Sequence, residues 1–188
     1  MNLFRSAFFA VALAASSGSD VTAQDFDNVG AESWVFHESD NWQVRVNESS
    51  FNRLDCTATT FGESYKKPQF GAVFLAVRND ADGDLQIILG EEGVIFAQED
   101  YFIGFHVDND RLGTKLTGFG SNKAGVYIPV PKNRYGENLI SRIMDGNTLK
   151  IYEPSNFDNL YWFDLRGSKT ALLELSRCSA NLSSTPNL

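Results

Sequence analysis

Short runs in which apolar and polar residues alternate recur along most of the chain. A period of two is the pattern of a β-strand with one buried face. It is clear from Trp42 to Val46 and again from Tyr101 to Val107. Turns rich in Gly, Asp and Asn separate these runs, as is typical of antiparallel strands. Further strands are predicted at residues 34–36, 54–61, 70–77, 85–89, 94–96, 112–119, 124–130, 148–152 and 161–165.

One segment in the second half follows the helical period instead. Tyr135, Leu139 and Ile143 are each four residues apart, so they lie on one side of a helix. This spacing predicts a helix over about 132–145. Gly146 follows it and is expected to end the helix in the left-handed conformation, which glycine adopts without strain.

A second helix is predicted over 168–178, near the C-terminus. Gly167 provides a tight turn before it, and the hydroxyl of Ser168 is expected to act as its N-cap. Ala171, Leu175 and Cys178 are spaced i, i+4 and i+7, so they share one face of this helix. That face must lie on the sheet.

These elements predict a mainly β fold. Many short strands separated by turns indicate a single antiparallel β-sandwich or flattened barrel, here with two short helices. Within 188 residues we expect a signal peptide at 1–23, one β-rich domain at 24–178 and a flexible tail at 179–188.

The signal peptide is predicted from the usual order of features. Arg5 supplies a positive charge, and a short apolar run spans 7–15. The small residues Val21-Thr-Ala23 then form a cleavage site. The apolar run is too short to cross a bilayer, for which about 20 residues are needed. The alternative is a retained N-terminal anchor.

The chain has two cysteines, Cys56 and Cys178. In an exported protein they predict one disulfide bond. Cys56 lies on the inner face of its predicted strand, which suits pairing with the inward face of the last helix. A redox or metal-binding pair is the alternative, but the chain has no CxxC motif.

The formal net charge of −8 is unevenly distributed. Residues 24–110 hold 17 acids and 5 bases, whereas residues 111–150 hold 7 bases and 2 acids. Ordinary solvated strand and helix faces would explain this asymmetry, and so would a basic surface for an anionic partner. Nucleic acid is not expected as the partner of an acidic, exported chain. The residues of the possible basic surface are Arg111, Lys115, Lys123, Lys132, Arg134 and Arg142.

No catalytic or metal-binding constellation stands out. His37 and His106 are the only histidines, and there is no G-x-S-x-G motif for a nucleophilic serine. The turn from Asp80 to Asp84 is acidic, but its spacing does not match an EF-hand loop, so a hairpin turn is the simpler interpretation. We therefore predict no catalytic residue, no metal site and no cofactor.

Several segments resemble, in order, parts of one known family. They are Val126–Asn133, Gly146–Lys150, Phe163–Ser168 and Ala171–Leu175 near the end, and Trp42–Val44 with Cys56 near the start. With these motifs the chain resembles the invasion-associated locus B family of bacterial exported proteins. The resemblance implies a β-rich periplasmic or envelope domain with two flanking helices, linked in some pathogens to host-cell interaction. It implies no catalytic residue.

The predicted function is a non-catalytic interaction module, located in the periplasm or secreted, that binds an envelope or host protein. After removal of the signal peptide no transmembrane segment is expected. The alternative is a periplasmic protein that binds a small ligand or a metal. An enzyme is the third hypothesis, and it would need a cleft that joins a histidine to carboxylates.

Overall fold

The structure is a computed structural model of the chain. It describes residues 33–48, 54–64, 72–79, 83–92, 94–110, 113–120, 125–152 and 159–184. The elements are β1 (Ser33–Ser39), β2 (Trp42–Glu48), β3 (Leu54–Ser64), β4 (Val73–Asn79), β5 (Leu85–Glu91), β6 (Asp100–Val107), β7 (Thr114–Gly120), β8 (Gly125–Pro129), α1 (Arg134–Asp145), β9 (Thr148–Tyr152), β10 (Asn159–Asp164) and α2 (Ser168–Ser184).

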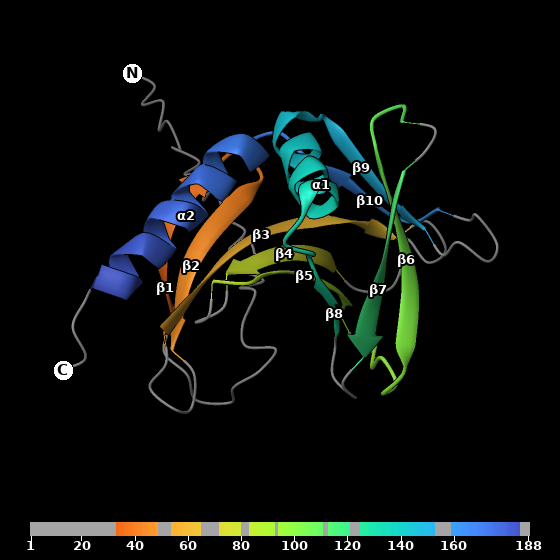
Figure 1. The fold of residues 1–188 in the computed structure, drawn as a ribbon, viewed down its shortest axis with the longest axis horizontal. Helices are drawn as coiled ribbons and strands as arrows, with labels where there is room; N and C mark the ends of the chain where they lie inside the picture. The colour runs from red at the N-terminus through yellow and green to blue at the C-terminus, as the bar shows by residue number, and fades with distance from the viewer. Residues whose placement is uncertain are drawn as a thin grey trace, which may run out of the picture.

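Eight antiparallel strands close into a barrel in the order β3, β10, β9, β6, β7, β8, β5 and β4, and β4 pairs back to β3 (Figure 1). The 11 residues of β3 make this closure possible. Its first part pairs with β2 and its last part with β10, so the β1–β2 hairpin extends the sheet beyond the barrel. The mainly β prediction is confirmed, and of its two architectures the chain adopts the barrel.

Alternation along the strands turns one row of apolar side chains into the barrel. These rows merge with the buried faces of both helices into one core. In the barrel strands the core residues are Cys56, Ala58, Val73, Leu75, Val77, Ile87, Leu89, Ile103, Phe105, Val107, Val126, Ile128, Leu149, Ile151, Tyr161 and Phe163.

Helix α1 covers the barrel end at which β8 ends and β9 begins (Figure 1). The side chain of Asn133 caps it by accepting hydrogen bonds from the N–H groups of Tyr135 and Gly136. Leu139 and Ile143 are fully buried, as their spacing predicted. The helical prediction is therefore confirmed in type, and Leu139 and Ile143 form its buried face, whereas Tyr135 at the start of the same stripe is exposed.

The role predicted for Gly146 is wrong. Its backbone is extended, with φ −85° and ψ 170°, rather than left-handed. Glycine is needed here for space, because a Cβ atom would overlap Val107 and crowd the carbonyl oxygen of Arg142. The turn at Gly167 does have the expected positive φ, at 87°.

Helix α2 packs across β1, β2 and β3, beside the barrel (Figure 1). Ala171, Leu175 and Cys178 are all buried, as predicted. The helix does not end at 178 but continues to Ser184, because Leu182 still packs against the core. The first part of the expected flexible tail is therefore helical.

The N-cap role predicted for Ser168 is not what the structure has. This side chain is buried, and its hydroxyl donates to the carbonyl oxygen of Ile143 at 2.7 Å. It thus satisfies an acceptor near the C-terminal end of α1, where carbonyl groups lack helical partners. The hydrogen bond fixes α2 against α1.

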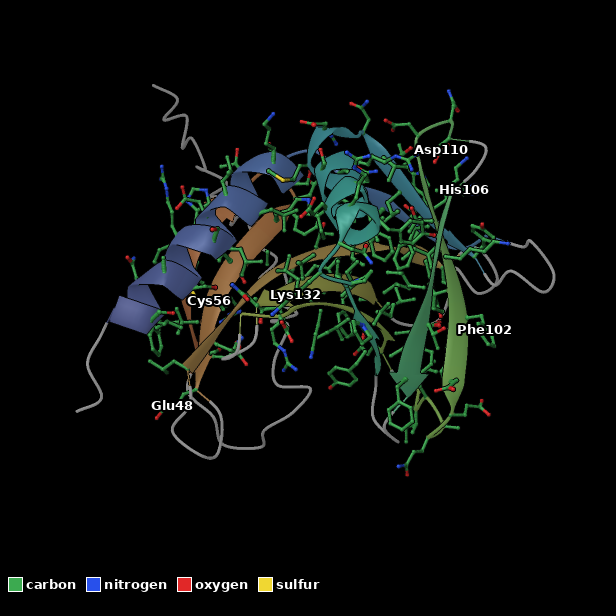
Figure 2. All side chains as sticks on the ribbon, viewed as in Figure 1. Glu48, Cys56, Phe102, His106, Asp110 and Lys132 are labelled. Atoms are coloured by element: carbon green, nitrogen blue, oxygen red, sulfur yellow. A yellow bond between two sulfur atoms is a disulfide. The ribbon has the colours of Figure 1, made fainter. Side chains whose placement is uncertain are left out.

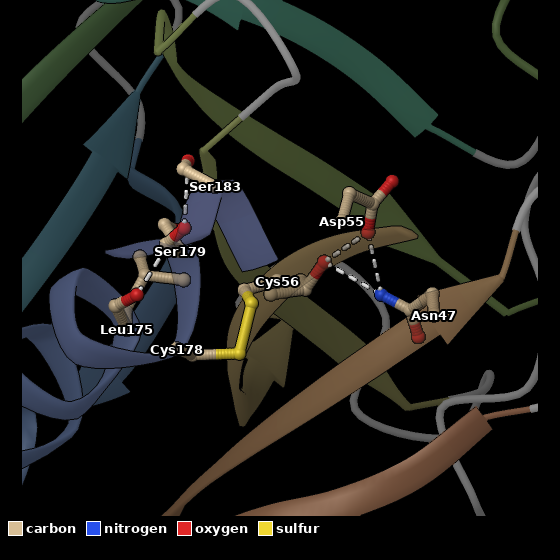
Figure 3. The surroundings of a disulfide bond; sticks show 8 residues. Asn47, Asp55, Cys56, Leu175, Cys178, Ser179 and Ser183 are labelled. Carbon is tan, nitrogen blue, oxygen red and sulfur yellow. Dashed lines mark hydrogen bonds between the residues drawn. A yellow bond between two sulfur atoms is a disulfide. The ribbon is translucent and has the colours of Figure 1, made fainter. Parts of the chain in front are cut away.

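The predicted disulfide between Cys56 and Cys178 is present (Figure 3). It joins β3 to α2, and the two cysteines have Cα atoms 6.1 Å apart and a sequence separation of 122. Beside it the side-chain amide of Asn47 donates to Asp55 and to Thr57, both at 2.9 Å. This side of the molecule is held by a covalent bond, apolar packing and satisfied polar groups.

The remaining expectations concern a short strand and the signal peptide. The strand predicted at 94–96 is absent from this described stretch, where only Phe96 forms an isolated bridge and Ile95 is exposed. The predicted signal peptide at 1–23 lies outside the described residues. Among the helices of the described ranges, none is long and apolar enough to cross a membrane.

Candidate functional site

The basic residues predicted to form one surface lie in different places. Lys132 and Arg134 lie at the start of α1, where Lys132 forms an ion pair with Asp84. Figure 2 shows Lys132 well separated from His106 and Asp110. Arg111 and Lys123 lie outside the described residues.

The other two predicted residues, Lys115 and Arg142, lie close to His106. Strand register places them there together with Lys150. β6 pairs with β9 so that His106 is opposite Lys150, and β6 pairs with β7 so that Gly104 is opposite Lys115. Arg142 comes from the last turn of α1. We call His106, Lys115, Arg142 and Lys150 the basic face.

The basic face lies on the outside of the barrel. In β6 the neighbours Phe105 and Val107 point into the core, so alternation turns His106 outward. The imidazole packs against the ring of Tyr152, with centroids 4.6 Å apart and planes inclined at 59°. Tyr152 in turn covers Gly104, where a Cβ atom would overlap its ring. A glycine at this position therefore allows the two rings to lie side by side.

Tyr135 connects α1 to the basic face. Its hydroxyl accepts a hydrogen bond from the N–H of Lys115 at 2.9 Å and donates to the carbonyl oxygen of the same residue at 3.3 Å. These bonds join the first turn of α1 to β7. Half of the Tyr135 side chain stays exposed, at 46%. An aromatic ring is thus available to a partner at the border of the basic face.

The cations of the basic face act on the histidine. Burial lowers the pKa of His106 below its ordinary value of 6.5, and the positive charges of Lys150, Arg142 and Lys115 lower it further. The imidazole of the unbound protein is therefore held in its neutral form near neutral pH. A neutral imidazole can both donate and accept a hydrogen bond.

Carboxylates offset only part of this positive charge. Asp110 pairs with Arg142 and also accepts a hydrogen bond from the N–H of Gly113 at 3.1 Å. Lys150 forms no ion pair with any carboxylate in the described ranges. The face keeps ammonium and guanidinium groups that can bind an anionic group.

The turn beside the basic face is fixed by Asp108. Its backbone is left-handed, with φ 53°, and its carboxylate accepts hydrogen bonds from the N–H groups of Asn147 and Thr148. Burial raises the pKa of Asp108, but these hydrogen bonds outweigh burial and lower the pKa below its ordinary value. The ionised carboxylate therefore joins the end of β6 to the start of β9 near neutral pH.

This arrangement suits binding of carboxylate or phosphate groups to an outer face. Nothing in the described ranges resembles a metal centre, because no three His, Cys, Asp or Glu side chains gather there. Of the acidic turn, Asp80 and Asp82 lie outside the described residues, and Asp84 pairs with Lys132. The other histidine, His37, lies on β1, away from the basic face (Figure 1).

The fold is similar to that of a protein known from a crystal structure, invasion associated protein B from Bartonella henselae. The TM-score is 0.52 at 16% sequence identity, and the match covers 78% of this chain and 99% of the other. The chain shares the fold of that protein. The match supports the family resemblance that the sequence motifs indicated. No protein-family model matches the chain, and no curated protein matches it.

The sequence did not indicate Lys150, Tyr152 or Tyr135 as members of a site with His106. Alternation over residues 148–152 does turn Lys150 and Tyr152 outward together. Which strand lies next to them depends on the closure of the barrel, which no local pattern encodes.

Proposed function

We propose that the protein is an exported, non-catalytic interaction module that binds an acidic segment of an envelope or host protein through the basic face. The observation that carries the proposal is the convergence of Lys115, Arg142 and Lys150 on His106. Tyr135 adds exposed aromatic surface and a hydroxyl group, and Tyr and Arg are enriched at protein interfaces.

Two further observations favour an exported location and a role in surface interaction. Disulfide bonds such as Cys56–Cys178 persist in the periplasm and outside the cell, whereas the cytosol keeps thiols reduced. The chain also shares its fold with a protein named for an association with invasion.

The charge of the whole protein makes the position of this face important. A net charge of −8 repels an acidic partner from most of the surface. Attraction is then confined to the places where cations gather, and complementary potentials favour one orientation of docking. A partner with several carboxylates in one segment is complementary to the positive potential of the basic face.

The proposal is tested with the double variant Lys115→Gln/Lys150→Gln and a fluorescein-labelled oligoglutamate peptide as the probe. Exposed ion pairs contribute about 0.2–1 kcal/mol each, so loss of two should weaken binding by about tenfold. Fluorescence anisotropy measures the dissociation constant, which should also rise with salt because salt screens exposed charges.

The matched control is Lys132→Gln/Lys169→Gln. It removes the same number of lysines from ion pairs elsewhere, with Asp84 and Asp145. We expect it to bind the peptide like the unaltered protein. Equal weakening in both double variants would show that only net charge matters, and it would contradict a specific basic face. The same two variants, photocrosslinked in the source envelope, then identify the natural partner.

A further inference from the structure

A buried carboxylate lies inside the barrel, at the end opposite α1. Glu91 is the last residue of β5, and alternation places it inward, in line with Ile87 and Leu89. Its exposed fraction is only 6%. The other end of β5 lies near α1, because the N–H of Val130 donates to the carbonyl oxygen of Leu85.

The hydroxyl of Tyr161 reaches Glu91 across the interior of the barrel. Tyr161 lies on β10, which is not a neighbour of β5, and its Oη lies 3.1 Å from Oε2 of Glu91. Burial, followed by the negative charge of Glu91, raises the pKa of Tyr161. The phenol therefore stays protonated and donates its hydrogen bond to the carboxylate.

The second carboxylate oxygen is left without a partner. Oε1 of Glu91 is buried and forms no hydrogen bond, and no Lys, Arg or His among the described residues forms an ion pair with Glu91. A buried charge without a counter-charge is costly. One neutral phenol does not supply that counter-charge. A positively charged hydrogen-bond donor would supply it.

We propose that this inner end of the barrel binds a small organic cation, an ammonium or guanidinium group on an apolar body, with Glu91 as its counter-ion. Tyr161 orients the carboxylate, so that Oε1 accepts a hydrogen bond from the N–H of the ligand. Apolar residues such as Val73, which pairs with Glu91 across β4 and β5, would contact the body of the ligand.

A metal ion is a poorer fit for this site. Calcium takes six to eight oxygen ligands, and structural zinc takes four ligands rich in Cys and His. Among the described residues, Glu91 and Tyr161 supply one carboxylate and one phenol, and Ser64 opposite Tyr161 adds a hydroxyl. The described part of the chain holds no cluster of three metal-ligating side chains. A single carboxylate oxygen does suffice for the N–H of a cation. This site is on the inside of the barrel and independent of the basic face.

The experiment measures binding of n-butylammonium and n-butylguanidinium to the purified protein by isothermal titration calorimetry, with 1-butanol as the uncharged probe. We expect saturable binding of at least one cation and none of butanol. Glu91→Gln should weaken that binding at least tenfold, because the amide keeps the shape but loses the charge. Without ligand, Glu91→Gln should melt no lower than the unaltered protein.

Glu92→Gln is the matched control, because Glu92 is the neighbouring residue and is exposed. It should leave cation binding unchanged. Tyr161→Phe is the second variant, with weaker binding expected from the loss of the orienting hydrogen bond. Absence of saturable binding to the unaltered protein, or equal binding to Glu91→Gln and Glu92→Gln, would overturn the proposal. Neither result depends on whether the basic face binds oligoglutamate.

Discussion

The side of the barrel that contacts α2 is buried and covalently linked, whereas the side that contacts α1 keeps charged side chains partly exposed. Where α2 lies on β2 and β3, Cys56 and Cys178 are bonded and fully buried, and the nearby polar side chains pair with one another. Where α1 meets the barrel, the side chains of His106 and Lys150 are only half-buried, and Lys150 forms no ion pair with a carboxylate of the described ranges.

The difference suggests that stability and binding are carried by separate parts of the chain. The α2 side resists opening because its contacts are covalent and apolar. The basic face holds charged groups in fixed positions but keeps them accessible, which is what binding of a charged partner requires. Variants on the α2 side should therefore lower stability without changing binding.

The largest effect is expected from Cys178→Ser. The disulfide closes a loop of more than a hundred residues, and on the loop-entropy model it stabilises the fold by about 4–5 kcal/mol. For a protein of this length that corresponds to a fall in Tm of about 10–15 °C under oxidising conditions, measured by circular dichroism. At a temperature where the variant remains folded, its affinity for oligoglutamate should not change.

The unaltered protein in the presence of a reductant is the control, and it should melt like the variant. If Tm does not change in Cys178→Ser, the bridge does not stabilise the α2 side. If peptide binding falls in parallel with Tm, the two sides are coupled and the separation is wrong.

A smaller effect is expected from Gly104→Ala, which targets the basic face. The added methyl group would overlap the ring of Tyr152, so that ring and the adjacent imidazole of His106 must shift. Overpacking of this kind costs about 1–3 kcal/mol. Anisotropy should show weaker peptide binding in addition to the lower Tm.

Gly83→Ala is the matched control for that substitution. Gly83 has φ 77° and no atom near the added methyl, so alanine there costs about 1–2 kcal/mol through backbone strain alone. Both variants should lose stability, but only Gly104→Ala should lose binding. Unchanged affinity in Gly104→Ala would show that the position of the Tyr152 ring does not matter for the basic face.

The sequence predicted the α2 side better than the basic face, for a physical reason. The burial of Ala171, Leu175 and Cys178 follows from helical spacing, and a single pair of cysteines leaves one possible bridge. Helical spacing is a local feature of the sequence, and the bridge follows from the number of cysteines. The predicted cap at Ser168 was wrong, because its hydroxyl donates to the carbonyl oxygen of Ile143 in α1, a contact between distant segments.

The basic face depends almost wholly on such distant contacts. Lys115, Arg142 and Lys150 meet at His106 only because β9 is inserted beside β6 when the barrel closes. Charge counting identified the region but grouped these residues with Lys132, which pairs with Asp84 elsewhere. Nothing in the local sequence shows that Glu91, the last residue of β5, points inward toward Tyr161.

The most direct measurement of the central claim is an NMR titration of the two histidines with and without oligoglutamate. In the unbound protein the pKa of His106 should lie below 6.5, because burial and three cations disfavour the imidazolium. Carboxylates bound at the basic face favour it, so the pKa of His106 should rise with the peptide and binding should tighten as pH falls through this range. The imidazole resonances of His37, on the distant strand β1, are the internal reference and should keep their chemical shifts when the peptide is added at constant pH. A His106 pKa that does not change at saturating peptide, or equal peptide-induced chemical-shift changes at both imidazoles, would contradict the basic face as the binding site.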